Sequence, residues 1–291
     1  MHQAFILGAG LGMRLRPLTN FLPKPLVPLF HRPLAAWAVD ACMRAGIRRV
    51  AINTHHLPDA WNAFPDRPEF AGCDFTLFHE PVLLETGGGL KNIESWIGDH
   101  PLLIHNGDIF STLPLEKLIA AHEASGNPVT LALRTGGPSP HIAMDSTATH
   151  VTDIHGKLTG IPGTHTFSGI YCIDPEFLEL IPSEKIISVI PAFLELARIG
   201  KLGCVVLDEG LWVDLGDIPS YLAAHRTLAL APFVHPDAII AANATIGNSV
   251  IGPGAIVENG ARLDGCVVWP GATVAAHENA TDRVFCGETR A

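Results

Sequence analysis

The sequence predicts an α/β protein with a Rossmann-like, mostly parallel sheet flanked by helices, followed by a short left-handed parallel β-helix. Three observations support this class. Apolar strands alternate with helical segments over residues 1–231, a pattern typical of parallel sheets with right-handed crossovers. The composition, 47% hydrophobic and 16% charged, suits a large buried core. From residue 233 the chain repeats itself. We therefore expect two domains, 1–231 and 232–291.

The alternating part of the chain divides into elements by its periodicity and by its glycine and proline residues. Residues 136–165 are poorly periodic, and we expect short strands and loops there that shape a substrate pocket. A strand-to-turn element is expected at 210–216. The other predicted strands are 4–7, 48–53, 74–78, 101–105, 129–134, 166–173 and 204–207. The predicted helices are 33–45, 59–64, 89–97, 115–124, 187–199 and 218–230.

The C-terminal part contains three similar segments that begin 17 residues apart, at residues 233, 250 and 267. Prolines recur at 236, 253 and 270, and alanines at 238, 255 and 272. Within each segment the apolar positions step by about six residues, which indicates a hexapeptide-repeat, left-handed β-helix of two to three coils. The alternative is an irregular tail rich in glycine and alanine. A β-helix exposes a coil end and flat faces, so we expect it to form a homodimer or to cap the first domain.

Charge and cysteine content narrow the function. A net charge of −10 argues against a nucleic-acid partner or an anionic membrane surface. The six cysteines are scattered without a C-x-x-C pair, as in free thiols of a reducing cytoplasm. No signal peptide or membrane span is recognisable. We therefore expect a cytoplasmic location, and any phosphate ligand must be held by local cations.

The first strand runs into a glycine-rich segment, residues 7–26, which we call the phosphate loop. Glycines at 8, 10 and 12 let backbone N–H groups approach a ligand closely. Arg14 and Lys24 follow, on a segment stiffened by three prolines. The spacing excludes the P-loop and the dinucleotide fingerprint. Backbone donors and fixed cations together predict polyphosphate binding, whereas the alternative is an ordinary turn with surface cations.

Two aspartates have positions suited to a metal ion. Asp108 follows an apolar strand, where α/β sheets collect ligands at the carboxyl ends of their strands. Asp214 stands in a W-V-D-L-G segment. Carboxylates there would hold Mg²⁺ against phosphate oxygens. The alternative for each is a turn or N-cap aspartate, which is our expectation for Asp217, ahead of the last helix.

These motifs together resemble the sugar-1-phosphate nucleotidyltransferases. The resemblance rests on G-A-G-x-G-x-R-L-R-P-L-T…P-K-P-L-V-P, N-G-D and W-V-D-L-G, and it covers residues 3 to about 230. It implies the nucleotidyltransferase fold and transfer of NMP from an NTP to a sugar 1-phosphate, with release of pyrophosphate. It also implies Mg²⁺ on Asp108 and Asp214, with Arg14 on the triphosphate and Lys24 between the reacting phosphates as the catalytic cations.

The resemblance extends to the substrate pockets. Residues 85–89, E-T-G-G-G, resemble the family's base-recognition segment, and we call them the base loop. Alternatives are a flexible turn for the base loop and strand packing for residues 166–169. The implied nucleotide-binding residues are Gly8, Ala9, Gly10, Leu11, Gly12, Met13, Arg14, Lys24, Glu85, Gly87 and Gly88. The implied sugar-phosphate residues are Asn106, Thr166, Ser168 and Gly169.

Two branches of the family are similar to this chain. E-T-G-G-G, N-G-D and T-F-S-G-I look most like the N-acetylmuramate-1-phosphate uridylyltransferases of cell-wall recycling, which use UTP. The wording of the phosphate loop is shared with mannose-1-phosphate guanylyltransferases, which use GTP and often carry a β-helix. The Glu-Lys-Pro found near the sugar phosphate in many relatives is missing, and Lys157 is not an obvious substitute.

Two other classes of function remain as remote alternatives. The β-helix could belong to an acyltransferase, but it has few coils, and neither His235 nor His277 has a partner that suggests a general base. A non-catalytic regulatory protein that binds a nucleotide sugar would have no need of both metal carboxylates. Release of pyrophosphate would separate the enzyme from both.

Overall fold

The computed structural model describes residues 1–137 and 139–287 and divides the chain into two compact units. The first unit comprises Met1–Gly10 and Trp37–Trp212. The second comprises Leu11–Ala36 and the chain from Val213 onward. The phosphate loop therefore starts in one unit and continues into the other. The sequence boundary at residue 231 stays a prediction.

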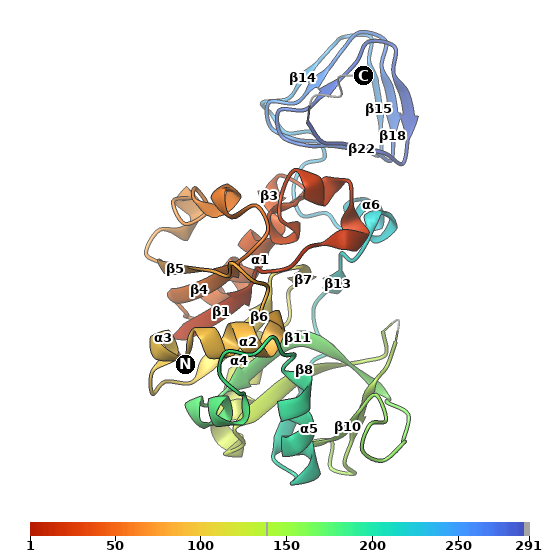
Figure 1. The fold of residues 1–291 in the computed structure, drawn as a ribbon. Coiled ribbons are helices and arrows are strands. Elements are labelled where there is room, and N and C mark those ends of the chain that lie inside the picture. Colours follow the sequence, from red (N-terminus) through yellow and green to blue (C-terminus); the bar gives the residue numbers. More distant parts are fainter. Residues whose placement is uncertain (138, 288–291) are drawn as a thin grey trace. The chain divides into compact units, whose positions relative to one another are not determined.

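A nine-stranded sheet forms the centre of the first unit (Figure 1). β1 lies between β4 and β6 and is parallel to both, and β5 continues the parallel run beside β4. β11 is antiparallel to its neighbours β6 and β8, so the sheet is mostly but not wholly parallel. Its strands are β1 (Gln3–Leu7), β4 (Arg49–Thr54), β5 (Asp74–His79), β6 (Leu102–Asn106), β8 (Val129–Thr135), β9 (Ile142–Met144), β10 (Val151–Ile154), β11 (His165–Ile173) and β12 (Leu202–Val206).

Helices pack against this sheet because apolar residues line both faces of its central strands. One large core joins α2, α3 and α5 to the strands through buried residues such as Phe5, Leu90 and Phe193. The α-helices are α1 (Leu34–Arg44), α2 (Glu85–Asn92), α3 (Glu94–Ile97), α4 (Leu115–Ser125), α5 (Ile190–Arg198) and α6 (Ile218–Thr227). The shorter 3-10 helices are Met13–Leu15, Leu18–Asn20, Lys24–Leu26, Pro58–Trp61, Pro68–Phe70 and Pro175–Leu180. The remaining strands before the β-helix are β2 (Pro28–Leu29), β3 (Arg32–Pro33), β7 (Ile109–Ser111) and β13 (Trp212–Asp214).

Two predicted helix boundaries are wrong. The helix expected at 89–97 begins at Glu85, passes through three glycines and is interrupted at Ile93. The helix expected from residue 187 begins at Ile190. Both errors have one cause, because the segment before α5 crosses α2 closely and hydrogen-bonds to its first turn. Tertiary packing overrides the weak helix propensity of glycine here.

The second unit contains the predicted β-helix. Its strands form three parallel sheets of three strands each, so there are three coils in the part of the chain described. The register repeats every 17 residues, since Ile239 pairs with Ile256, and Ile256 with Thr273. The sequence repeat thus places the same position of each coil in one sheet. The strands are β14 (Ile239–Ile240), β15 (Thr245–Gly247), β16 (Val250–Ile251), β17 (Ile256–Val257), β18 (Arg262–Asp264), β19 (Val267–Val268), β20 (Thr273–Val274), β21 (Asn279–Thr281) and β22 (Val284–Phe285).

The β-helix shares its core with the second half of the phosphate loop. Leu15 and Leu18 belong to the same buried cluster as Val268. Tyr221 of α6 links the two parts, because its hydroxyl donates to the Pro28 carbonyl (2.6 Å) and accepts from Trp269 Nε1 (3.0 Å). All of these groups are buried. The second unit is therefore one packed body and not a β-helix alone.

Two further features bear on the sequence expectations. Within the described residues, no helix is long and apolar enough to cross a membrane. The six cysteines carry free thiols, as expected from their spacing.

Candidate active site

The carboxyl ends of four parallel strands meet at one edge of the first unit's sheet. β1, β4, β5 and β6 are neighbours that run in the same direction. Gly8 follows β1, Glu80 follows β5, and Gly107 and Asp108 follow β6. Ligands of open α/β sheets bind at this edge, so the topology collects the predicted motifs where a substrate site is expected.

The start of the phosphate loop is held by a buried amide side chain. Asn53 Oδ1 accepts hydrogen bonds from the N–H groups of Gly8 (2.8 Å) and Ala9 (3.2 Å). A Cβ on Gly8 would lie 2.6 Å from the carbonyl oxygen of Asn53, so only glycine fits there. These two amides therefore fix the turn and are not directed at a ligand.

A pocket of about 260 Å³ joins the phosphate loop to the base loop. Ala9 and Glu85, both predicted to bind nucleotide, lie together in its wall. Glu85 is exposed and has a φ of 62°, a conformation that costs a residue with a Cβ about 1–3 kcal/mol and is enriched at functional sites. The residues that line the pocket are Leu7, Ala9, Asn53, Leu83, Glu85, Thr86 and Ser188.

Gly87 and Gly88 of the base loop have a packing role. Their N–H groups both donate to the Ile187 carbonyl, at 2.8 and 3.0 Å. A Cβ on Gly88 would lie 2.4 Å from the carbonyl oxygen of Lys185. These glycines let the segment before α5 cross the helix, which the sequence did not foretell. Their contact with a nucleotide stays a prediction.

The N-G-D and T-F-S-G-I motifs lie against one another. A Cβ on Gly169 would lie 2.6 Å from Asn106 Nδ2, and the Gly169 φ of 79° also favours glycine. Gly107 donates its N–H to the carbonyl of Leu7 (3.0 Å), which ties the turn that carries Asp108 to the end of β1. Two of the predicted sugar-phosphate residues are thus neighbours, close to the start of the phosphate loop.

His105, one residue before this turn, is fully buried. Burial lowers its pKa to about 4, so the ring is neutral at pH 7. Its Nδ1 lies 2.7 Å from the carbonyl oxygen of Asn106, to which it donates. A neutral ring therefore supports the backbone at Asn106.

The other two predicted sugar-phosphate residues, Thr166 and Ser168, are buried in β11. Ser168 Oγ donates to the Ala132 carbonyl (2.7 Å), and the Ser168 carbonyl accepts from Trp212 Nε1 (2.7 Å). Thr166 Oγ1 is buried without a hydrogen-bond partner among the described residues. Ser168 is thus engaged in the strand, whereas Thr166 retains a hydroxyl that a ligand could use.

The second unit holds the predicted cations and one predicted metal carboxylate. Lys24 Nζ lies 3.6 Å from Asp214 Oδ1, and the Lys24 side chain is only 9% exposed. The exposed Arg14 side chain lies beside Gly216, where a Cβ would be 3.1 Å from its Nη1. Leu11 and Met13, between the glycines and Arg14, are exposed, at 43% and 54%. The segment thus displays its cations next to the W-V-D-L-G motif.

Gly12 and Asp217 also have clear local roles in this unit. Gly12 has a φ of 56°, and its carbonyl accepts from Thr19 Oγ1 (3.0 Å). Asp217 is the N-cap of α6 in a capping box with Ser220, as predicted. Hydrogen bonds from Ser220 are the main cause that lowers the pKa of Asp217, and the positive charges of Arg14 and Lys24 add to it.

The carboxylates fit a magnesium ion chemically. Mg²⁺ usually binds one or two protein carboxylates and completes its shell with water and substrate phosphates. Asp108 is partly exposed in the first unit and Asp214 is 44% exposed in the second, so neither carboxylate is sealed from a ligand. No group of three or more His, Cys, Asp or Glu side chains with metal-site geometry occurs among the described residues.

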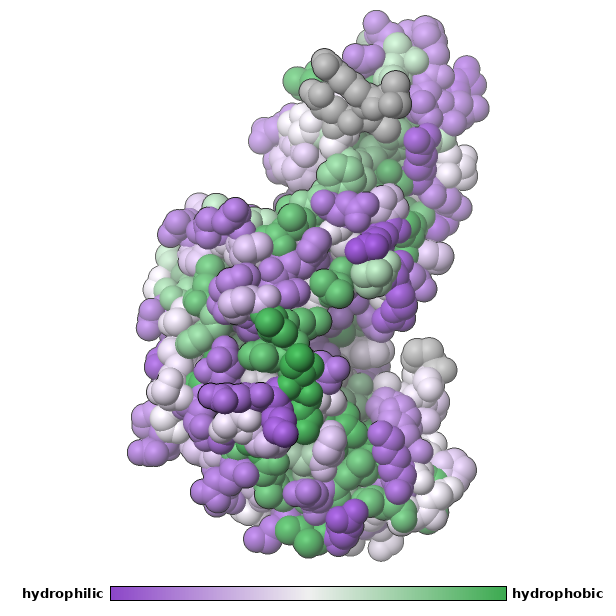
Figure 2. Space-filling view, in the orientation of Figure 1, coloured by the Kyte–Doolittle hydropathy of each residue, from purple (hydrophilic) through white to green (hydrophobic). Residues whose placement is uncertain are grey.

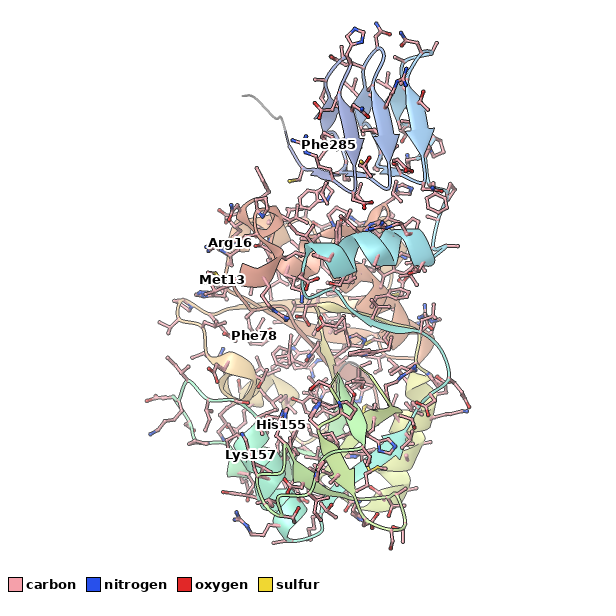
Figure 3. The ribbon with its side chains drawn as sticks, turned by 90° about the vertical axis from the view of Figure 1, so that its right-hand side faces the viewer. Met13, Arg16, Phe78, His155, Lys157 and Phe285 are labelled. Carbon is pink, nitrogen blue, oxygen red and sulfur yellow. The ribbon has the colours of Figure 1, made fainter. Side chains whose placement is uncertain are left out.

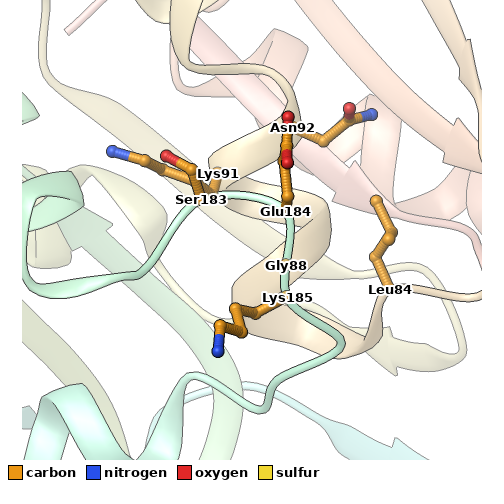
Figure 4. Close-up of a pocket in the computed structure, with 7 residues that line it drawn as sticks. All are labelled: Leu84, Gly88, Lys91, Asn92, Ser183, Glu184 and Lys185. Atoms are coloured by element: carbon orange, nitrogen blue, oxygen red, sulfur yellow. The ribbon is translucent and has the colours of Figure 1, made fainter.

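Two other features carry no role in the site as we describe it. Lys157 is exposed on the turn between β10 and β11, next to His155 (Figure 3). A second pocket, of about 380 Å³, borders α2 and residues 183–185. In Figure 4 the Lys91 and Lys185 side chains point away from Leu84 and Asn92, which also line it.

Sequence reasoning missed Asn53 and Glu80. Both follow the general rule that polar side chains at the carboxyl ends of parallel strands belong to the site. Asn53 Nδ2 donates to Glu80 Oε1 (2.8 Å), and both residues are nearly fully buried. Their positions at the ends of β4 and β5 were the available signal.

Gly10 offers a clean test of ligand approach. No described atom lies within 4 Å of where its Cβ would be, and its φ is not positive. Gly10→Ala should therefore leave the Tm unchanged but raise the KM for the NTP about tenfold, if backbone at this point meets the phosphates. Thermal unfolding and steady-state kinetics on one preparation measure both. An unchanged KM would contradict close approach at Gly10.

The strand-end edge, the glycine-rich loop and the cation–carboxylate pair define an α/β enzyme of phosphoryl transfer from a nucleotide. The chain belongs to the nucleotidyl transferase family, whose model matches residues 3–230. This match spans the β-sheet unit and the phosphate loop. The predicted enzyme class, a sugar-1-phosphate nucleotidyltransferase, is confirmed.

Similar proteins carry related names. The chain is 29% identical over 274 residues to a probable mannose-1-phosphate guanylyltransferase 2 of Arabidopsis thaliana, covering 86% of this chain and 75% of that protein. It is 26% identical over 254 residues to a UTP–glucose-1-phosphate uridylyltransferase of Synechocystis, covering 77% of this chain and 62% of that protein. A putative glucose-1-phosphate thymidylyltransferase from Bacillus anthracis has the same fold, with a TM-score of 0.67 at 18% identity, over 77% of this chain and 94% of that one.

Proposed function

We propose that this enzyme transfers UMP from UTP to a sugar 1-phosphate of the N-acetylmuramate type, forming a UDP-sugar and pyrophosphate. The reaction class follows from the family. The choice of UTP and of an amino sugar is supported by the contact between the N-G-D and T-F-S-G-I motifs, through Asn106 and Gly169, together with the E-T-G-G-G base loop.

The residues have separate tasks in this proposal. A sugar-phosphate oxygen, already ionised, attacks the α-phosphorus, and the bond to the β-phosphate oxygen breaks with its electron pair leaving on pyrophosphate. No protein nucleophile or proton transfer is needed, so catalysis depends on positioning and charge. Arg14 would hold the triphosphate and the leaving pyrophosphate, and Lys24 the reacting phosphates. Asp108 and Asp214 would hold Mg²⁺, which supplies positive charge to the phosphate oxygens.

The pocket beside the base loop would take the nucleoside. Ala9 and Leu7 offer apolar contact, and the Glu85 carboxylate can accept hydrogen bonds from N–H or hydroxyl groups. Asn106, Gly169 and Thr166 would border the sugar phosphate. The Thr166 hydroxyl, which has no partner in the described part of the chain, is the most direct candidate for a sugar contact.

A mannose-1-phosphate guanylyltransferase is the second candidate. The Arabidopsis relative with that name matches 86% of this chain, more than the catalytic part alone. The wording of the phosphate loop also agrees with that branch.

A substrate matrix tests both candidates. We expect pyrophosphate release to be highest with UTP and N-acetylmuramate 1-phosphate when UTP, GTP, CTP, ATP and dTTP are each paired with several sugar 1-phosphates. Preference for GTP with mannose 1-phosphate would favour the second candidate. No release with any pair, despite nucleotide binding, would contradict the enzyme itself.

We also propose a cytoplasmic enzyme that is a homodimer through its β-helix. Ile239 and Ile256 are exposed side by side in one of its sheets, at 61% and 37%. Hydrophilic residues cover much of the visible face of the coils (Figure 2), so a dimer contact would centre on such an apolar strip. Light scattering of the full chain measures the mass, and a monomer would contradict the proposal.

A further inference from the structure

We infer that Glu80 is a positioning residue for the nucleotide, because its buried carboxylate couples the phosphate loop to the base loop through Asn53. The inference rests on the proposed function, since it assumes that a nucleotide occupies the pocket between these loops. Glu80 itself does not line that pocket.

Four hydrogen bonds form the link. Asn53 Oδ1 accepts from the N–H groups of Gly8 and Ala9, at the start of the phosphate loop. Asn53 Nδ2 donates to Glu80 Oε1 (2.8 Å). Glu80 Oε2 accepts from the N–H of Leu84 (3.0 Å), immediately before the base loop. One buried pair of side chains thus connects two loops that lie more than seventy residues apart in the sequence.

The pair is shielded from water on every side that the structure describes. Glu80 is 1% exposed and Asn53 is 2% exposed. Gly89 of α2 lies directly over it, where a Cβ would be 2.8 Å from Glu80 Oε1 and 2.9 Å from Asn53 Nδ2. This contact accounts for the third glycine of the base loop. Hydrogen bonds in such a place are costly to leave unmade.

The pattern of donors requires a carboxylate at position 80. Two backbone N–H groups fix the Asn53 amide so that its Nδ2 must face Glu80. The N–H of Leu84 faces the other Glu80 oxygen. Position 80 must therefore accept twice, which a carboxylate does and an amide does not. Glu80→Gln keeps the size but sets one donor against another.

The consequence for binding follows from the pocket. Ala9 and Glu85, on opposite loops, contact the same cavity, and Asn53 lies between them in its wall. A nucleotide that bridges the two loops needs them at a fixed spacing. Loosening the link makes binding order the loops first, which weakens affinity for the nucleotide but not for the sugar phosphate.

A double-mutant cycle tests the link. Glu80→Gln and Asn53→Asp should each raise the KM for the NTP about tenfold, with the KM for the sugar 1-phosphate unchanged within about twofold. The double variant E80Q/N53D should recover most of the loss. In it the new carboxylate at position 53 accepts from both loop amides and from the new amide at position 80, whose oxygen accepts from Leu84. Glu94→Gln, on an exposed carboxylate paired with Lys91, is the matched control.

Hydrogen exchange keeps this inference separable from the proposed function. Exchange at the amides of Gly8, Ala9 and Leu84 should be faster in E80Q than in the wild type or E94Q, whatever substrate the enzyme uses. Unchanged exchange, equal losses in both KM values, or a lower Tm with an unchanged NTP KM would overturn the link. A wild type that is inactive with every NTP, but shows faster exchange in E80Q, would support the link and contradict the proposed function.

Discussion

Asp108→Asn should lower kcat about a hundred- to a thousandfold and change the dissociation constant for the NTP only a few-fold. The substitution keeps the size and the turn after β6 but removes a negative charge from a proposed Mg²⁺ ligand. Charge supplied by a metal ion to a phosphoryl transition state is worth several kcal/mol, and each 1.36 kcal/mol is tenfold in rate. Single-turnover kinetics and calorimetric titration with the NTP separate the two quantities.

Asp99→Asn is the matched control for this prediction. Asp99 is an exposed carboxylate shortly before β6, at the other end of the strand that Asp108 follows. It should leave kcat unchanged, since the same charge is lost far from the substrate edge. An Asp108→Asn enzyme with wild-type kcat would exclude a metal role for this residue. A raised Mg²⁺ requirement in the Asp108 variant would add direct support.

Lys24→Met should lower kcat about a hundredfold or more without unfolding the protein. The Lys24 side chain is nearly buried and its Nζ lies 3.6 Å from Asp214, so an unbranched apolar side chain of similar length should fit. Asp214 is 44% exposed, and water can solvate it when its partner is lost. A fixed cation at the reacting phosphates stabilises the charge that develops in the transition state.

Thermal unfolding and kcat of the Lys24 variant, measured together, check this expectation. Lys117→Met removes a lysine that is 51% exposed and paired with Glu209, and it should leave kcat unchanged. Activity of Lys24→Met within about threefold of the wild type would show that the cation is not used in the reaction.

The strands and the repeat could be predicted from the sequence because their signals are local. β1, β6 and β11 are short apolar runs, and the 17-residue repeat maps directly onto the register of Ile239 and Ile256. The phosphate loop was recognisable because glycines and cations follow β1 within a few residues. Each of these predictions needed only neighbouring residues.

The parts that could not be predicted depend on contacts between distant segments. Gly87 and Gly88 look like helix breakers until Lys185 and Ile187 are seen to cross them. The Asn53–Glu80 pair is formed only when β4 and β5 lie side by side. Periodicity has no term for either, because both depend on which strands and segments become neighbours.

The shared core of the second unit bears on how this protein could have been assembled in evolution. Tyr221 is hydrogen-bonded to Pro28, near the start of the chain, and to Trp269 in the β-helix. Recombination that exchanged only residues after 231 would leave a tyrosine and an apolar surface without their partners. A heritable module therefore has to include residues 11–36, α6 and the coils together. Chimeras with relatives should be cut accordingly, with the N-terminal segment and the C-terminal coils taken from the same parent.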